Sequence, residues 1–223
     1  MSQLWEIILT EFPTAIWETL YVTVLSTLFA TVIGLPLGVL LVVGEMKSVF
    51  PMPKILLKGL NFIINVLRSV PFLILMILVL PLSRLIVGTT VGTEATIVPL
   101  TIAAFPFIAR LVESSLREVD YNVVEASLSM GASPLQIVVK VLLPESLPSL
   151  VSNFTIALTT VLGYTAMSGI LGGGGLGKIA INYGYYRYQN DVMFVAVFAL
   201  ILLVELLQEA GTFISKKMDK RKR

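Results

Sequence analysis

The sequence predicts an all-α, polytopic membrane protein with five transmembrane helices and a cytoplasmic loop of short helices between spans 3 and 4. Composition is the first observation: 56% of the 223 residues are hydrophobic and only 13% are charged, which is too apolar for an ordinary soluble domain. The second is that five apolar runs are long enough to cross a bilayer, which takes about 20 residues. These runs cover residues 15–43, 55–82, 95–116, 147–171 and 192–214.

Charge placement is the third observation, because Lys and Arg gather on the cytoplasmic side of membrane proteins. The segment before the first span carries Glu6, Glu11 and Glu18 but no Lys or Arg, so we expect the N-terminus outside and the C-terminus in the cytoplasm. The basic residues expected in the cytoplasm are Lys47, Lys54, Lys58, Arg110, Arg117, Lys140, Lys216, Lys217, Lys220, Arg221, Lys222 and Arg223. Those expected outside are Arg84, Lys178 and Arg187.

The first three spans contain features of helix packing and of charge. Gly34 and Gly38 have the small-xxx-small spacing that lets helices approach closely, and we favour packing over gating for them. Arg68 lies about one third of the way into the second span, where a charge near the bilayer centre costs about 3 kcal/mol. It either snorkels to the interface or serves an inner gate. The third span should present Arg110 and Glu113 to the cytoplasm.

The fourth span is too polar to face lipid along its length. Thr160, Tyr164, Met167 and Ser168 recur at helical spacing, which places hydroxyls, a ring and a thioether on one face. Such a face suits a translocation path for a small amphipathic solute. For the threonines, hydrogen bonding between helices is the alternative that we favour.

Two segments flank the last span. Residues 172–177 are rich in glycine but lack the Gly-Lys-Ser/Thr ending of a nucleotide loop, so we expect a flexible or tightly packed turn. The tyrosine-rich residues 182–188 either anchor the chain at the outer interface or dock an external protein. In the last span, Glu205, Gln208 and Glu209 share one face, and we expect a buried packing network rather than proton transfer.

The loop at residues 121–147 is predicted to form two short helices. Asn122 with Glu125 can cap the first helix, and Gly131 can end it in a left-handed conformation. In the second, Ser133 is the expected cap, with Pro134 in the first position and Gln136 completing the box, and Pro144 is expected to limit its length. The apolar residues beside Glu125 could fill a groove on a soluble partner; an amphipathic loop lying on lipid is the alternative.

The loop also resembles a known signature. The order Glu-Ala-Ser at 125–127, Gly131, nine further residues, and Val-Leu-Leu-Pro at 141–144 resembles the EAA motif of ABC importer permeases. Ser127 and Val141 are modest departures from the residues common there. The resemblance implies a cytoplasmic loop whose first helix docks into a cleft of the ATPase subunit. The coupling residues it implies are Glu125, Ala126, Ser127, Met130, Gly131 and Ala132.

Further stretches resemble the methionine-uptake branch of these importers over nearly the whole chain. They lie at residues 17–20, 34–41, 68–72, 97–101, 163–167, 174–177 and 183–185. The resemblance implies one permease domain over residues 1–223 that works as a homodimer by alternating access. It implies two ABC ATPase subunits that bind ATP and Mg, an external lipoprotein binding protein, and a substrate route lined by Tyr164 and Met167.

Other functions stay open at this point. The chain has no Cys and no His, which removes the usual thiol nucleophile and the commonest general base, so we expect no catalysis. We also expect no cofactor or metal in this chain and no nucleic-acid partner. The nearest alternative is a permease for another amino acid; an intramembrane enzyme using Glu205 and Glu209, and a passive channel, are the more distant ones.

Overall fold

A computed structural model describes residues 2–46 and 48–218 and divides the chain into two compact units. The first unit contains Met1–Phe29, Val70–Ala104 and Leu158–Glu209; the second contains Ala30–Ser69, Phe105–Ala157 and Ala210–Arg223. Long helices contribute residues to both units. Of the basic residues expected in the cytoplasm, those outside the described residues are Lys47, Lys220, Arg221, Lys222 and Arg223.

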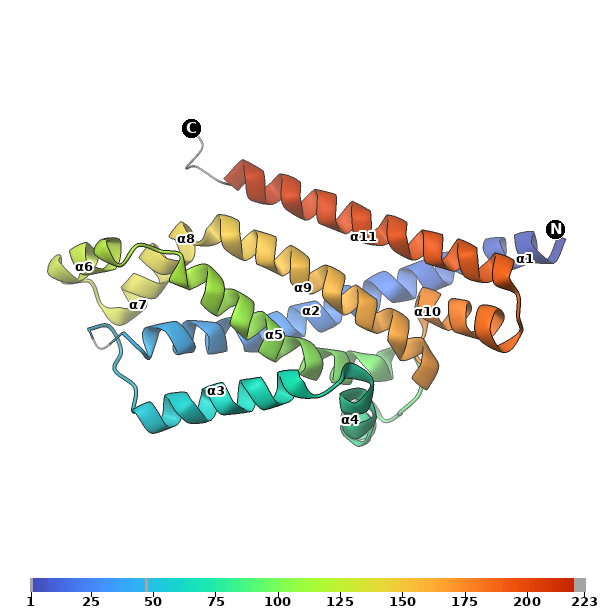
Figure 1. Cartoon of the computed structure of the whole chain (residues 1–223), viewed down its shortest axis with the longest axis horizontal. Coiled ribbons are helices and arrows are strands. Elements are labelled where there is room, and N and C mark those ends of the chain that lie inside the picture. The colour runs from blue at the N-terminus through green and yellow to red at the C-terminus, as the bar shows by residue number, and fades with distance from the viewer. Residues whose placement is uncertain (1, 47, 219–223) are drawn as a thin grey trace. The chain divides into compact units, whose positions relative to one another are not determined.

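Every regular element within the described ranges is a helix (Figure 1). The label α marks α-helices, η1 and η3 are 3-10 helices, and η2 and η4 are π-helices. In chain order they are α1 (Ser2–Thr10), α2 (Phe12–Val43), α3 (Lys54–Ser69), α4 (Phe72–Val87), η1 (Glu94–Thr96), α5 (Ile97–Arg117), α6 (Tyr121–Ser129), α7 (Pro134–Ile137), η2 (Val138–Leu142), α8 (Leu143–Glu145), α9 (Leu147–Ser168), η3 (Gly169–Leu171), α10 (Gly175–Ile179), η4 (Ala180–Tyr186) and α11 (Asn190–Met218).

The predicted spans agree with these helices, except that the second is broken. The described residues contain four helices long and apolar enough to cross a membrane, and a fifth crossing if α3 and α4 count as one broken span. The break falls at Val70 and Pro71 because a proline lacks the amide donor and disfavours the helical conformation of the residue before it. The helix α1 is an addition to the predicted elements.

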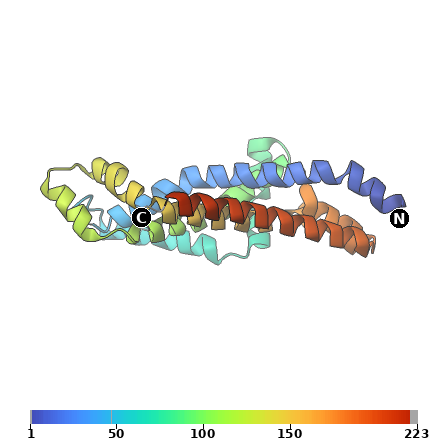
Figure 2. The ribbon, with the colours of Figure 1, turned by 90° about the horizontal axis from the view of Figure 1, so that it is seen from above.

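The first unit has its core where the start of α2 meets α10 and the start of α11. Figure 2 shows α2 and α11 running beside each other there. The buried side chains of this cluster are Phe12, Ala15, Leu176, Ile179, Val192 and Ala196. The cluster fixes α10 against the first span, which positions the glycine-rich turn before α10.

In the second unit, α2 packs closely on α5, as the spacing of Gly34 and Gly38 predicts. A Cβ added at Gly34 would lie 2.8 Å from the Phe105 carbonyl oxygen, and one at Gly38 would lie 2.6 Å from that of Ala109. Leu41, Ile64 and Ala109 form a small buried cluster in this unit. The packing role expected of these glycines is therefore confirmed.

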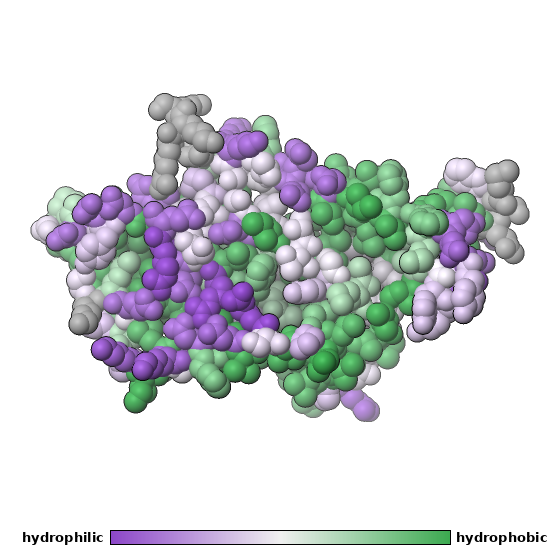
Figure 3. All heavy atoms as spheres, viewed as in Figure 1, coloured by the Kyte–Doolittle hydropathy of each residue, from purple (hydrophilic) through white to green (hydrophobic). Residues whose placement is uncertain are grey.

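Apolar side chains also cover broad areas of the surface (Figure 3). In α11 these include Phe194, Phe198, Leu206 and Phe213, each more than half exposed. A large contiguous apolar surface marks membrane or protein contact. With several long apolar helices, it makes the chain a multi-pass membrane protein.

The buried network expected at Glu205, Gln208 and Glu209 is wrong for the single chain. All three side chains are exposed in the first unit. The reason is that only 11% of the apolar window of α11 is buried, because little of the helix surface contacts the rest of the chain.

Candidate functional site

The loop at residues 121–147 begins with α6, whose two ends are closed by hydrogen bonds. The helix starts two residues earlier than the Asn122 cap predicts: Asp120 is the cap, and its carboxylate accepts the Asn122 backbone N–H at 2.9 Å. At the other end, the Gly131 N–H reaches the Leu128 carbonyl at 2.9 Å. The Ala132 N–H reaches the Ser127 carbonyl at 3.1 Å. These two bonds form a Schellman motif, which requires the positive φ of +82° seen at Gly131.

The second helix of the loop has the predicted capping box. The Gln136 backbone N–H donates to Ser133 Oγ at 3.4 Å, and the Ser133 N–H donates to Gln136 Oε1 at 2.8 Å. The expectation that Pro144 ends this helix is wrong. Helical structure continues from α7 through the π-helix η2 into α8, with Pro144 in the first turn of α8, where its missing N–H leaves few helical bonds unmade.

The described side chains of the loop divide between its own core and solvent. Val124, Ile137 and Leu142 are fully buried beneath α6 and α7, which makes the two helices one compact knob. Of the predicted coupling residues, Glu125, Ala126, Met130 and Gly131 are exposed, Ala132 is half-buried and Ser127 is buried. The large exposed apolar side chains of this knob are Tyr121, Val123, Met130 and Leu135, and Val139 follows in η2.

An ionic network lies beside the knob in the second unit. Arg117, the last residue of α5, contacts Glu45 and Glu113, each at 2.8 Å. Arg110 contacts Glu113 at 2.5 Å and donates to Asn65 Oδ1 at 2.9 Å. The network ties the end of α5, three residues before α6, to α3 and to the segment after α2.

The predicted path residues lie on α9 in the first unit, and three of the four reach its surface. Met167 is 39% exposed, while Thr160 and Tyr164 are half-buried. The Tyr164 ring stacks on Phe72 with centroids 4.4 Å apart, so its position on α9 is fixed by α4. Ser168 is buried, and its hydroxyl donates to the Thr165 carbonyl at 2.7 Å, so it does not share the surface of the other three.

Hydrogen bonds from α2 hold the glycine-rich turn, and sequence reasoning missed the residues that make them. Glu18 accepts the Gly175 N–H at 2.7 Å and the Thr93 hydroxyl at 3.0 Å. Thr19 Oγ1 accepts the Leu176 N–H at 2.9 Å. The two residues thus satisfy the first amide donors of α10 from 157 positions away. The sequence did contain a signal for them, because Glu18 and Thr19 are adjacent polar residues within an apolar span.

The turn itself is tightly packed rather than flexible. Gly173 lies against Ser168, with a Cβ there only 2.7 Å from its hydroxyl, and a Cβ at Gly177 would overlap the Ala166 carbonyl. A Cβ at Gly175 would meet Thr19 Oγ1 at 2.5 Å. Glycine is therefore needed because the backbone of the turn lies against α9 and α2.

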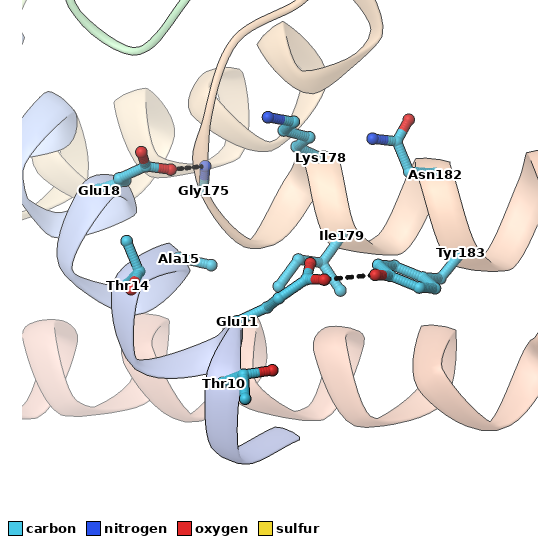
Figure 4. A pocket seen from close by; sticks show the side chains of 10 residues that line it. All are labelled: Thr10, Glu11, Thr14, Ala15, Glu18, Gly175, Lys178, Ile179, Asn182 and Tyr183. Carbon is cyan, nitrogen blue, oxygen red and sulfur yellow. Dashed lines mark hydrogen bonds between the residues drawn. The ribbon is translucent and has the colours of Figure 1, made fainter. Parts of the chain in front are cut away.

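A pocket of about 280 Å³ with a mixed polar and apolar lining opens beside this turn in the first unit (Figure 4). One wall comes from the end of α1 and the start of α2, and the other comes from α10 and η4. The lining residues are Thr10, Glu11, Thr14, Ala15, Glu18, Gly175, Lys178, Ile179, Asn182 and Tyr183. Both carboxylates already accept hydrogen bonds from the chain, whereas no partner is seen among the described residues for the side chains of Lys178 and Asn182.

Tyr183 joins the two walls of the pocket. Its hydroxyl donates to Glu11, and the Arg187 guanidinium lies over its ring, 4.5 Å from the centroid. The hydrogen bond to Glu11, with a smaller contribution from desolvation, raises the pKa of Tyr183 above its usual value of about 10.

Comparisons with known proteins agree with this architecture. Residues 34–223 match the family model described as the binding-protein-dependent transport system inner membrane component. The chain is 48% identical over 209 residues to the probable D-methionine transport system permease protein MetI of Vibrio cholerae, covering 93% of this chain and 92% of that protein. It is 51% identical over 154 residues to the D-methionine transport system permease protein MetI of Escherichia coli, covering 69% and 70%.

Solved structures show the same likeness. A chain of the MetNI methionine ABC transporter in an inward-facing conformation is 47% identical, with a TM-score of 0.90, and covers 93% of this chain and 95% of its own length. A chain of an amino acid ABC transporter crystallised with histidines is 17% identical with a TM-score of 0.75, which shows a shared fold alone.

Proposed function

The chain belongs to the family of binding-protein-dependent transport system inner membrane components, and we propose that it is the permease subunit of an ATP-driven importer for methionine. The observation that carries the proposal is the likeness, over nearly the whole chain, to permeases named for D-methionine transport. The chain itself has no catalytic role in this proposal. A separate ATPase subunit binds ATP and Mg, and residues 1–223 form one permease domain that moves solute inward by alternating access.

The knob of α6 and α7 is the proposed contact with the ATPase. Its exposed residues Glu125, Ala126 and Met130 would enter the partner's cleft, while buried Ser127 and the turn at Gly131 and Ala132 support α6 from below. Met130 is 80% exposed, which suits an apolar anchor in a groove. The network around Arg117 would pass the motion of the knob to α3 and α5.

Met130→Asp tests the contact because it places a charge on the apolar anchor without touching the knob's core. We expect less ATPase to co-purify with this variant. Ser129→Ala is the matched control, since Ser129 is exposed on the same turn and bonds only to its own helix. Equal recovery of the ATPase with both variants would contradict the assignment.

The proposed substrate route includes Thr160, Tyr164 and Met167, with Ser168 acting indirectly through the packed turn. A ring and a thioether offer soft, adaptable contacts to an apolar side chain. Met167→Asp should lower transport, whereas the volume-conserving Met167→Leu should keep most of it. Unchanged uptake kinetics in a well-expressed Met167→Asp protein would remove this residue from the route.

The proposed orientation is an outside N-terminus and a cytoplasmic knob and C-terminus. Because the chain has no cysteine, single cysteines at Ser2 and Ser133 can be probed with an impermeant thiol reagent on intact cells. Labelling at position 133 with none at position 2 would reverse the orientation.

The full assembly proposed is a homodimer with two ATPase subunits, served by an external lipoprotein binding protein. The decisive measurement is uptake of labelled L- and D-methionine by the reconstituted complex, with and without ATP, in competition with a panel of amino acids. Stronger inhibition by another unlabelled amino acid than by unlabelled methionine would favour the alternative substrate. Methionine flux that is the same with and without ATP would indicate a passive channel.

A further inference from the structure

The segment between α2 and α3, in the second unit, is folded into turns. The Val49 N–H donates to the Met46 carbonyl at 3.0 Å, and the Met52 N–H donates to the Gly44 carbonyl at 3.3 Å. Val49 is buried, and a Cβ added at Gly44 would lie 2.8 Å from Met52 Sδ. We call the described residues of this segment, 44–46 and 48–52, the brace. Its packing makes the brace a fixed extension of α2.

The brace reaches the base of the knob through two side chains. Glu45 Oε2 lies 2.8 Å from Arg117 Nη2. Ser48 Oγ shares a hydrogen bond of 3.0 Å with the Tyr121 hydroxyl. Because Arg117 ends α5 and Tyr121 begins α6, the two contacts lie on either side of the link at residues 118–120. The brace therefore holds both ends of the link that sets the direction of α6.

The link itself has weak backbone bonding. The N–H groups of Glu118 and Val119 reach carbonyls only three residues back, each at 3.3 Å, which is longer than the usual value of about 2.9–3.0 Å. One further side-chain contact comes from α9, where Ser149 Oγ donates to the Glu118 carboxylate at 3.0 Å. A link of this kind bends more easily than a regular helix, so the side chains that hold it decide its angle.

The ion pair of the brace is balanced in charge and open to solvent. The carboxylates of Glu45 and Glu113 match the guanidinium groups of Arg110 and Arg117, so the cluster has no excess charge. The side chains of Arg117 and Glu45 are 46% and 47% exposed, and exposed ion pairs contribute little to folding stability. If Glu45 is neutralised, Arg117 keeps Glu113 at 2.8 Å. Positioning can therefore be separated from stability by experiment.

We propose that Glu45 and Ser48 are positioning residues, which fix the angle between α5 and α6 and thereby join the motion of the knob to that of α2. This inference rests on the proposed function, in which the knob contacts the ATPase, and it adds α2 to the helices that the network around Arg117 reaches. Without the two contacts the knob keeps its buried core, but α6 turns on the link without moving α2. ATP hydrolysis then continues with less transport.

The coupling test measures methionine uptake and ATP hydrolysis by the complete reconstituted complex. Glu45→Gln combined with Ser48→Ala should lower the uptake per ATP hydrolysed by roughly threefold, which is within the usual range for changes in coupling between sites. Lys58→Gln is the matched control, because it removes one charge from an exposed residue of α3 in the same unit. A wild-type ratio of uptake to hydrolysis in the double variant would overturn the inference.

Two further measurements on the double variant separate positioning from other roles. Wild-type recovery of the ATPase, with a melting temperature lowered by less than about 5 °C, supports positioning. Reduced recovery of the ATPase would make the brace a contact of the ATPase itself, and a larger fall in melting temperature would make its role structural. Either result would overturn the inference.

Rescue by a covalent bridge tests position directly. In this cysteine-free chain, Ser48→Cys with Tyr121→Cys removes the hydrogen bond, and a short bis-thiosulfonate reagent then joins the two positions. The bridge should return the uptake per ATP hydrolysed toward the wild-type ratio, because it restores the position of α6 without the hydrogen bond. Ser48→Cys alone is the control for the reagent. A ratio that stays low after bridging would overturn the inference.

Failure of this inference and failure of the proposed function give different results. The proposed function is tested on the wild-type complex, where ATP-driven methionine uptake is expected whatever the brace variants do. A wild-type complex without such uptake would remove the proposed function itself. A wild-type complex with such uptake, together with fully coupled brace variants, would remove only the role of Glu45 and Ser48.

Discussion

Gly131 in the knob and Gly175 at the start of α10 have almost the same backbone conformation, with φ of +82° and +84°, but different surroundings. No atom lies within 4 Å of a Cβ built on Gly131, whereas one built on Gly175 would meet Thr19 Oγ1 at 2.5 Å. The first glycine is needed for backbone conformation alone. The second is needed for conformation and for space. A turn exposed to a partner and a turn locked inside the chain therefore use the same residue for different reasons.

The largest expected effect on stability is at the glycine-rich turn before α10, which we call the locked turn. Gly175→Ala combines the strain of a positive φ with overlap on Thr19, so we expect a loss of about 3 kcal/mol in stability. Thermal unfolding of the purified protein in detergent measures this change. Gly163→Ala is the control, because a Cβ there has no atom within 4 Å and the site is in the interior of α9. Equal melting temperatures for the two variants would contradict the packing argument.

Glu18→Ala should have the next largest effect, because it removes the acceptor of two hydrogen bonds in the locked turn. The Gly175 N–H and the Thr93 hydroxyl would lose their partner, which costs about 1–3 kcal/mol when a partly buried donor stays unsatisfied. Glu6→Ala, at an exposed glutamate of α1, is the control and should melt within about 1 °C of wild type. A melting temperature as high as that of the control would show that the carboxylate is dispensable.

Gly131→Ala should cost only about 1 kcal/mol, since the strain of its backbone is not joined by any overlap. Its effect on coupling to the ATPase should exceed its effect on stability, because the two hydrogen bonds of the Schellman motif set the direction of α6. Gly131→Asn is the matched variant, as asparagine tolerates this conformation better than other residues with side chains. We expect ATP hydrolysis stimulated by the binding protein to fall in the order glycine, asparagine, alanine, and the reverse order would contradict the assignment.

The smallest effect is expected for Tyr183→Phe, which removes the exposed hydrogen bond to Glu11 and should cost under about 1 kcal/mol. The bond raises the pKa of Tyr183 in the folded chain, so its contribution is complete below the unfolded pKa of about 10. It is lost as pH rises through the higher folded value. The stability difference between wild type and variant should therefore stay constant from about pH 7 to 9 and shrink only in stronger alkali. A difference that shrinks near pH 8 would exclude this bond as its cause.

The knob was largely predictable because its signals are local. Ser133, Pro134 and Gln136 act within four residues, and the capping box forms as expected. The Asn122 cap was predicted wrongly because Asp120, two residues earlier, is the cap; Asn122 lies inside the first turn of α6, and its own N–H is the amide that the Asp120 carboxylate accepts. The prediction that Pro144 ends the second helix was wrong because a proline in the first turn of a new helix segment leaves few backbone hydrogen bonds unmade.

The locked turn was not predictable in the same way. The glycine run indicated a turn, but only contacts across 157 residues reveal that Glu18 and Thr19 hold α10. Ser168 likewise shares a helical face with Met167 in sequence, yet it is buried against the turn while Met167 is exposed. Helical spacing places side chains on a face without saying what covers that face.

Apolar runs and charge placement in the sequence determined the helices, their approximate bounds and an expected orientation, because crossing a bilayer depends on length and hydrophobicity along the chain. The sequence also determined the Gly131 turn and the capping of α7, since both depend on neighbouring residues. Tertiary structure alone decided which glycines are sterically required, which carboxylates are already satisfied and which donors are left open in the pocket beside α10. Those properties depend on atoms brought together from distant segments, and no local pattern encodes them.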